Sequence, residues 1–245
     1  MRQLWVFDFD GTLAELVPNR ALAAILPESQ LMLQELSLRP ETSVAILTSR
    51  TVEDVRLRVD CQDLYLGGTS GLFWQDPQQT VVVANPIAKD RAVKLRELVL
   101  PPLREVIAPF EVDLEDKFVS VTVHYRNLDA DLHSKLVWSL QLFTAAHNLN
   151  LFQGPFAHEI PLDSAINKTE GLRSLFRLFP EKFDAQTTTF AGDDANDAQA
   201  MSWLIENGGQ AIVVDSRISV FGSYKVASPM ELVHLIRLEF AQTAR

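Results

Sequence analysis

Cysteine is almost absent from this sequence: Cys61 is the one thiol among 245 residues. A lone cysteine cannot form an intrachain disulfide, and with no cysteine or histidine close to it in the sequence it does not suggest a zinc site. We therefore interpret Cys61 as a small buried or half-buried side chain. A secreted disulfide scaffold is therefore excluded as a protein class, and nothing near Cys61 suggests a zinc module.

Long apolar runs are missing too. No run approaches the ~18 residues that a membrane span requires. Charged residues also interrupt the amino-terminal segment too early for a signal peptide. The sequence therefore predicts a soluble cytoplasmic protein with no membrane partner.

Basic residues are scarce relative to acidic ones. Lysine and arginine together number 22 against 32 aspartates and glutamates, so the net charge is −10. A chain of this charge repels phosphodiester backbones at long range, and we expect no nucleic-acid partner. Glycine and proline, at 10 and 12 residues, are too few for a collagen-like or linker-dominated chain.

What is present is typical of a globular protein, since 47% of the residues are hydrophobic. Short runs of β-branched and aromatic residues bounded by turn signals predict buried strands at residues 4–7, 43–47, 80–84, 188–191 and 211–214. Amphipathic helical patterns lie between several of these runs, near residues 28–38, 52–59, 167–179 and 196–206. Alternating strands and helices predict an α/β fold with a doubly wound, Rossmann-like parallel sheet.

The middle of the chain follows a different pattern. Residues 89–107 look helical, and we expect Pro101 and Pro102 to break that helix in two. Apolar–polar alternation predicts antiparallel strands at 110–115 and 119–125. We also expect a helix at 129–147, capped by Asp129, and short strands at 151–153 and 158–160. We therefore expect an α+β insert at residues 86–162, within a core formed by residues 1–85 and 163–245.

The first candidate site is a pair of carboxylates. Asp8 and Asp10 follow the strand at 4–7, and Gly11 allows a tight turn there. Doubly wound sheets bind ligands at the carboxyl ends of their strands. Two carboxylates so close attract a cation unless one takes a proton, and the side chain of one with the backbone carbonyl of the other can hold it. The alternative is a solvated acidic turn that caps the next segment.

A second acidic group follows the strand at 188–191. Asp193, Asp194 and Asp197 come after Gly192, which permits close approach. Clustered carboxylates without EF-hand spacing suit a hard cation that keeps several waters, which predicts Mg²⁺. The alternative is a cap for the following helix, because helix N-termini favour aspartate.

Hydroxyl groups and a lysine complete the pattern. Thr48 and Ser49 end the strand at 43–47, where they can contact a phosphate together with free N–H groups. Alternatively, one of them only caps the helix that begins at Val52. Lys168 opens a later helix, and its ammonium group can neutralise a phosphate or orient a carboxylate, or it is simply solvated.

Taken together and in this order, the motifs resemble those of the haloacid-dehalogenase (HAD) superfamily of phosphohydrolases: Asp-Phe-Asp-Gly-Thr-Leu, then Thr-Ser-Arg, then Lys168, then Gly-Asp-Asp-Ala-Asn-Asp. The insert has the position of that superfamily's type-two cap. Within the insert, Glu115-x-Lys117 followed by His-Tyr-Arg, and later Gly154 with Glu159, resemble the trehalose-6-phosphate phosphatases.

The resemblance implies roles for the acidic residues. Asp8 would be the nucleophile that forms an aspartyl phosphate, and Asp10 would protonate the leaving oxygen and then activate water. Mg²⁺ would be held by Asp8, the Asp10 carbonyl and Asp193. Asp194 and Asp197 would orient metal-bound waters or the lysine.

The remaining roles concern the substrate, expected to be a small sugar phosphate and first of all trehalose 6-phosphate, which would be hydrolysed to trehalose and phosphate. Thr48 and Lys168 would contact the phosphoryl oxygens. The residues expected to bind the sugar phosphate beyond these are Arg50, Glu115, Lys117 and Glu159. His124 is interpreted as structural, and Arg126 is assigned no role.

Several residues depart from the family pattern. The second motif has Thr-Ser-Arg instead of Ser-Gly-Arg, and Asn196 replaces a threonine. Ser70 stands where a histidine is usual, Pro155 where a lysine is, and Pro161 where an arginine is. A different substrate, of the sucrose-, glucosylglycerol- or mannosylglycerate-phosphate type, therefore stays open.

Two non-hydrolytic classes also stay open: a signalling module that stores phosphate on an aspartate, and a silent sugar-phosphate binder. Steady phosphate release would distinguish an enzyme from both. The sequence leaves the oligomeric state open and is compatible with a monomer.

Overall fold

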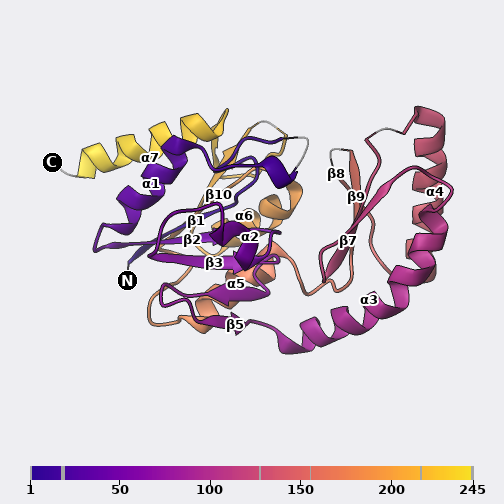
Figure 1. Ribbon diagram of the computed structural model, residues 1–245. Helices are drawn as coiled ribbons and strands as arrows, with labels where there is room; N and C mark the ends of the chain where they lie inside the picture. The colour runs from indigo at the N-terminus through magenta and orange to yellow at the C-terminus, as the bar shows by residue number, and fades with distance from the viewer. Residues whose placement is uncertain (1, 18–19, 127, 155, 216, 244–245) are drawn as a thin grey trace. The chain divides into compact units, whose positions relative to one another are not determined.

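The computed structural model describes residues 2–17, 20–126, 128–154, 156–215 and 217–243. Contacts divide the chain into two units (Figure 1). The core unit comprises Met1–Ala84 and Asn167–Arg245, and the insert unit comprises Asn85–Ile166. Within the described ranges, no helix is both long and apolar enough to cross a membrane.

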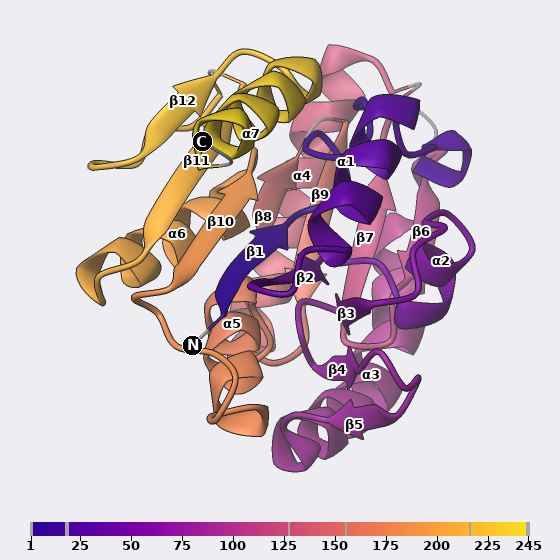
Figure 2. The same cartoon turned by 90° about the vertical axis from the view of Figure 1, so that its left-hand side faces the viewer.

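The core unit is built on an eight-stranded sheet with the order β12-β11-β10-β1-β2-β3-β4-β5, which can be followed in Figure 2. Its strands are β1 (Gln3–Phe7), β2 (Thr42–Leu47), β3 (Leu64–Gly68), β4 (Phe73–Gln75), β5 (Val81–Val83), β10 (Thr188–Gly192), β11 (Gln210–Val214) and β12 (Tyr224–Val226). The strands from β12 to β3 are parallel, whereas β4 and β5 are antiparallel. Because β1 lies at the centre and the chain continues on both sides of it, the predicted doubly wound α/β core is confirmed.

Helices cover both faces of this sheet: α1 (Pro27–Ser37), α2 (Val52–Arg56), α5 (Lys168–Leu178), α6 (Ala195–Glu206) and α7 (Pro229–Thr243), with a 3₁₀ turn η1 (Arg20–Leu22). Alternate residues of β1 enter opposite apolar clusters. Trp5 and Phe7 pack in the cluster that contains residues of α1, α2 and α7, while Leu4 and Val6 pack in the cluster of α5 and α6. This period of two explains why the strand is apolar throughout.

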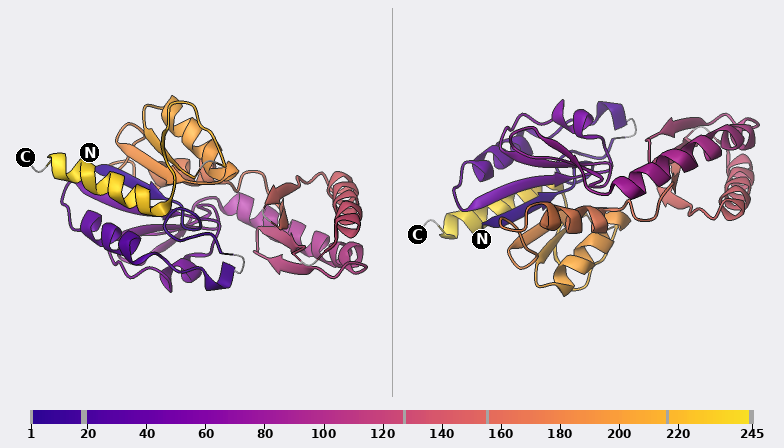
Figure 3. Two further views of the ribbon diagram at one scale, coloured as in Figure 1. Left: turned by 90° about the horizontal axis from the view of Figure 1, so that it is seen from above. Right: turned by 90° about the horizontal axis from the view of Figure 1, so that it is seen from below.

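The insert unit has an antiparallel sheet with the order β6-β7-β9-β8. Its elements are β6 (Asp113–Asp116), β7 (Ser120–His124), β8 (Phe152–Gly154), β9 (Ala157–Pro161), α3 (Pro86–Ile107) and α4 (Ala130–Ala146). Figures 1 and 3 show α4 on one side of this sheet. Asp129 caps α4, since its side chain accepts the Leu132 N–H at 2.8 Å. The predicted α+β insert is therefore confirmed.

The expected break in the first long helix is wrong, because α3 runs continuously through Pro101 and Pro102. Each proline removes one helical hydrogen bond and leaves the carbonyl four residues earlier without that donor. Those carbonyls belong to Glu97 and Leu98, which are exposed, so water can solvate them. On the other face, Val99 and Leu103 are fully buried and hold the helix to its unit.

One further expectation needs correction. The strand predicted at 80–84 exists as β5, but it is an antiparallel edge strand with Val81 50% exposed, not a buried one. An edge strand pairs on one side only, so its side chains find less cover. The sequence-based division ends the insert at residue 162, and the contacts place the end of the insert unit at Ile166. Arg91 of α3 pairs with Asp163 at 2.7 Å and so ties this segment to the insert unit.

Candidate active site

Parallel pairing brings the two acidic segments to one edge of the core sheet. β1 pairs with β10 over Phe7 and Ala191, so the residues that follow these strands lie side by side. The Asp8 N–H donates to the Ala191 carbonyl at 2.9 Å, which extends the ladder to the start of the site. Asp8, Asp193 and Asp197 are all buried here.

Lys168 bridges two of these carboxylates. Its Nζ lies 2.7 Å from Asp8 Oδ1 and 2.5 Å from Asp197 Oδ1, and its side chain is only 2% exposed. Burial alone would lower the pKa of this ammonium group, but Asp197 and Asp8 outweigh burial and raise the pKa well above its usual value. Lys168 is therefore a permanent buried cation beside Asp8, and the reading of it as a solvated helix start is wrong.

Asp197 is held from both sides. Its Oδ1 accepts a hydrogen bond from Lys168 Nζ. Its Oδ2 accepts hydrogen bonds from the N–H groups of Asp193 and Asp194, each at 3.1 Å. The Asp194 side chain in turn accepts the Asp197 N–H at 2.9 Å, so the two residues form a capping box for α6. Asp194 and Asp197 thus belong to the acidic cluster and also form the helix cap that the sequence offered as the alternative.

Asp193 presents a buried carboxylate that fits a hard cation. Oxygens of Asp8, Asp193 and Asp197 lie within 4.8 Å of one another. A Cβ at Gly11, where φ is +87°, would lie 2.3 Å from Asp193 Oδ2, so only glycine leaves room for this carboxylate. Burial, then repulsion from Asp8, raises the pKa of Asp193 to about 8. Excess buried negative charge and all-oxygen donors are the properties of a site for a hard cation.

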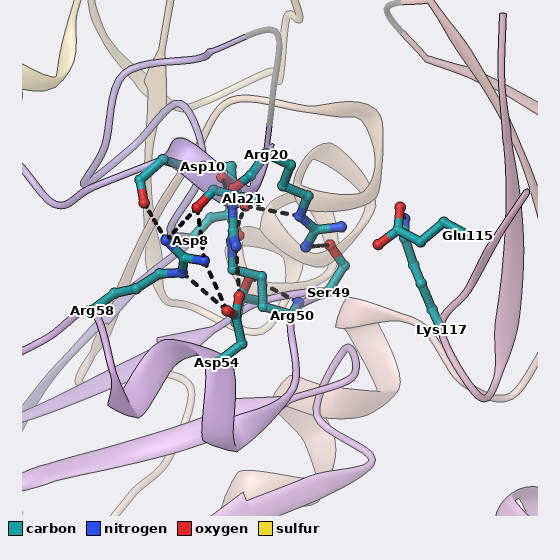
Figure 4. Close-up of polar contacts among 12 residues, drawn as sticks. Asp8, Asp10, Arg20, Ala21, Ser49, Arg50, Asp54, Arg58, Glu115 and Lys117 are labelled. Carbon is teal, nitrogen blue, oxygen red and sulfur yellow. Dashed lines mark hydrogen bonds and ion pairs between the residues drawn. The ribbon is translucent and has the colours of Figure 1, made fainter. Parts of the chain in front are cut away.

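Asp10 is held by a network of arginines (Figure 4). Arg50 donates from Nε to Asp10 Oδ2 and from Nη2 to Asp10 Oδ1, both at 2.7 Å. Its Nη1 bonds Asp54 Oδ2 at 2.5 Å, and Nη2 also donates to the Arg20 carbonyl at 2.7 Å. Arg20 Nε lies 3.6 Å from Asp10 Oδ2. Asp10 is therefore fixed in position by a bidentate pair.

The threonine at the end of β2 has a different role from the expected cap. Thr51, not Thr48 or Ser49, caps α2 by accepting the Asp54 N–H at 3.2 Å. Thr48 is buried, and its Oγ1 accepts the Arg50 N–H at 3.3 Å. Ser49 Oγ accepts a hydrogen bond from Arg20 at 3.0 Å.

The residues selected in the insert unit form one cluster on its sheet. Glu115 is paired across the sheet with Thr122, and Thr122 with Glu159, so all three side chains share a face. Lys117 Nζ lies 3.9 Å from Glu115 and 3.6 Å from Glu159. His124, interpreted as structural from the sequence, contacts Glu115 Oε2 at 2.9 Å.

The family model described as trehalose-phosphatase matches residues 6–232. The chain belongs to the trehalose-phosphatase family. A trehalose-phosphate phosphatase of Mycobacterium tuberculosis is 27% identical over 215 residues, covering 84% of this chain and 52% of that protein. The chain thus spans about half the length of such curated relatives.

Solved structures support the fold of this family member. The C-terminal domain of trehalose-6-phosphate phosphatase from Candida albicans superposes with a TM-score of 0.81 and 20% identity, covering 97% of this chain and 91% of that one. The C-terminal domain of a trehalose synthase regulatory protein from the same organism gives a TM-score of 0.74 with 11% identity, covering 96% and 94%. The family match over residues 6–232 confirms the resemblance inferred from the motifs.

The positions where this trehalose-phosphatase family member departs from the pattern are partly visible. Ser70 lies in a left-handed turn, with φ +57°, and its N–H donates to the Thr48 carbonyl at 2.7 Å. Pro161 ends β9. Pro155 lies outside the described residues.

Sequence reasoning missed several residues of the site. Asp54 and Arg58 follow Arg50 at intervals of four, a helical spacing that could have revealed their ion pairs of 2.5 and 2.9 Å. Arg20 comes from η1, and Arg217 comes from the loop after β11 and pairs with Asp193. No motif marks these two arginines.

Proposed function

We propose that this chain is a Mg²⁺-dependent phosphoric monoester hydrolase that acts on a small sugar phosphate, first of all trehalose 6-phosphate, through an aspartyl phosphate on Asp8. The observation that carries the proposal is the buried Asp8 carboxylate, 2.7 Å from the Lys168 ammonium group at the carboxyl end of the central strand. A nucleophile needs a dry, charge-balanced position of this kind to approach an anionic phosphate.

In the first step, an Asp8 carboxylate oxygen bonds to phosphorus while the bond from phosphorus to the sugar oxygen breaks. Asp10 gives its proton to that leaving oxygen. In the second step, water attacks the phosphorus of the aspartyl phosphate and Asp10 takes the proton from the water, so free phosphate leaves and Asp8 is restored. Arg50 serves this step by holding both Asp10 oxygens at 2.7 Å, which makes it a positioning residue in addition to the substrate contact inferred from the resemblance.

The other core residues supply charge. Lys168 and Thr48 contact phosphoryl oxygens, and Asp197 keeps Lys168 in place through its 2.5 Å contact. Asp8, the Asp10 carbonyl and Asp193 would hold Mg²⁺, with Asp194 helping to order its surroundings. When bound, the ion screens the repulsion between the carboxylate nucleophile and the phosphate.

The insert, residues 86–162 by the sequence-based division, would act as the cap that selects the sugar. Glu115, Lys117 and Glu159 offer charged partners for sugar hydroxyls, and such hydrogen bonds are strong once water is excluded. Another sugar phosphate remains the alternative substrate because Ser70 and Pro161 depart from the family pattern.

A sugar-phosphate binder without turnover is the second candidate. This candidate stays because a shared fold does not fix an activity, and one chain of the same fold is described as a regulatory protein. A phosphate-storing signalling module receives less support, because Asp10 would act as an acid and base near Asp8 and favour hydrolysis of the aspartyl phosphate.

The test is phosphate release from a panel of sugar phosphates with Mg²⁺. We expect trehalose 6-phosphate to be turned over, and Asp8→Asn to lose more than about a hundredfold in rate, since the nucleophile's charge is lost while its shape is kept. Asp60→Asn, at an exposed carboxylate of the same unit, is the matched control. Release by wild type in excess chelator, or by Asp8→Asn near the wild-type rate, would refute the mechanism. No release from any sugar phosphate would favour the binder.

A further inference from the structure

We propose that Arg217 is a built-in counter-cation of Asp193 that competes with the site's divalent metal ion and so weakens its binding. This inference rests on the proposed function, because it takes Asp193 as a metal ligand. Arg217 belongs to none of the four sequence motifs. Its charge sets the metal concentration at which the site fills.

Arg217 reaches a buried carboxylate from the outside. Its guanidinium Nη2 pairs with Asp193 Oδ2, while its Nε lies 3.0 Å from Asp215 Oδ2. The Arg217 side chain is 36% exposed, whereas the Asp193 side chain is 2% exposed. The loop begins directly after β11, where the Asp215 N–H bonds the Val226 carbonyl at 2.9 Å. The arginine is thus anchored beside β11 with its charge aimed into the site.

The guanidinium group is not needed to place the Asp193 carboxylate. Thr12 Oγ1 already donates to Asp193 Oδ1 at 3.3 Å, and the Asp193 N–H is bonded to Asp197 at 3.1 Å. Gly11 leaves room for the carboxylate without a clash. Removing the Arg217 charge therefore changes the electrostatics of Asp193 more than its position.

The charges of the site explain the competition. Oxygens of Asp8, Asp193 and Asp197 lie within 4.8 Å of one another, and the ammonium group of Lys168 contacts Asp8 and Asp197. Within the ranges that the structure describes, Arg217 is the basic side chain in contact with Asp193. A divalent ion on the Asp193 oxygens would share that carboxylate with the guanidinium group. Repulsion between the two cations at a few ångströms is strong enough to change a dissociation constant by about tenfold or more.

The experiment measures metal binding without substrate. Mn²⁺ serves as the probe, and its dissociation constant is determined by calorimetry and by paramagnetic resonance for wild type and Arg217→Gln. The glutamine side chain stays polar but is shorter and carries no charge. We expect Arg217→Gln to bind Mn²⁺ about tenfold more tightly, and Arg217→Lys, which keeps the charge, to stay near wild type. Thermal melting adds a second readout: the shift on adding Mn²⁺ should be larger in Arg217→Gln than in wild type.

Arg237→Gln is the matched control, because it removes an exposed pair with Glu35 at 3.0 Å in the same unit. Its affinity for Mn²⁺ should equal that of wild type. Unchanged or weaker Mn²⁺ binding by folded Arg217→Gln overturns the proposal while leaving the proposed function intact. If wild type itself binds no Mn²⁺ and releases phosphate in chelator, the metal-dependent function fails and the role of Arg217 falls with it.

Discussion

The two charge clusters of this chain contain the same groups at different burial. In the core unit, Lys168 is 2% exposed and contacts its carboxylates at 2.7 and 2.5 Å. In the insert unit, Lys117 is 15% exposed, with contacts of 3.9 and 3.6 Å to Glu115 and Glu159, themselves 38% and 29% exposed. A closely paired, buried charge loses much free energy when it changes its partner, whereas a distant, hydrated pair loses little. The difference fits the proposed division between a fixed centre for chemistry and an adaptable surface for recognition.

The largest expected effect breaks the core cluster. Lys168→Met leaves buried carboxylates without their cation, and we expect a loss of about 3–5 kcal/mol in the free energy of unfolding. Lys117→Met, the matched change in the insert, should cost under about 1 kcal/mol. Urea unfolding in chelator measures both. Equal losses would contradict the distinction between the two clusters.

The next effect sharpens the role of the insert. Glu159, which accepts a 2.7 Å bond from Ser120, should contribute to catalysis only when a sugar is present. We expect Glu159→Ala to lower kcat/KM for trehalose 6-phosphate. The loss should correspond to roughly 2–3 kcal/mol of transition-state stabilisation, the size expected for a charged hydrogen-bond partner. The rate on p-nitrophenyl phosphate, which has no sugar hydroxyls, should barely change.

Glu111→Ala, an exposed position of the same unit, should leave both substrates unaffected. Parallel losses on both substrates in Glu159→Ala would assign Glu159 to folding or to the chemical step.

The smallest effect concerns acid. His158 is buried, with its Nε2 3.2 Å from that of His133, and burial, followed by the charge of His133, lowers the pKa of His158. The unfolded chain binds a proton near pH 6.5 while folded His158 resists it, so stability is full above that pH and falls as the pH drops through the lower folded pKa. The protection factors of β9 amides, which correct hydrogen exchange for its intrinsic dependence on pH, should therefore fall modestly between pH 7.5 and 5.5.

His133→Gln should reduce this pH response, because it removes the neighbouring imidazole. His234→Gln, at an exposed position on α7, should not alter the response. A β9 exchange profile without any extra pH dependence would show that this pair does not couple to folding.

Local patterns predicted much of the core. Runs such as 188–191 mark buried strands, and because parallel strands end at one edge, Asp8 and Asp193 could be expected to lie together. Contacts from loops could not be anticipated, because no periodicity links Arg217 to Asp193 or Arg20 to Asp10. The proline expectation in α3 failed for a related reason: local chemistry favours a break, but burial of Val99 and Leu103 on the opposite face decides the outcome.

The role of Arg50 illustrates the same limit. Its motif suggested contact with substrate, yet its guanidinium group bonds Asp10, Asp54 and the Arg20 carbonyl. A motif identifies which side chain is required but not which neighbour it serves, since that depends on the path of the intervening chain.

The arrangement of charges in the site also depends on Gly11, which carries no ionisable group. A single methyl group at this position would lie 2.3 Å from an Asp193 oxygen, closer than atoms can approach. A chain that kept every carboxylate, lysine and arginine of the centre but gained that methyl group would lose the alignment of the charges. The missing side chain is therefore as much a part of the proposed reaction centre as the residues that carry charge, because only glycine fits at position 11.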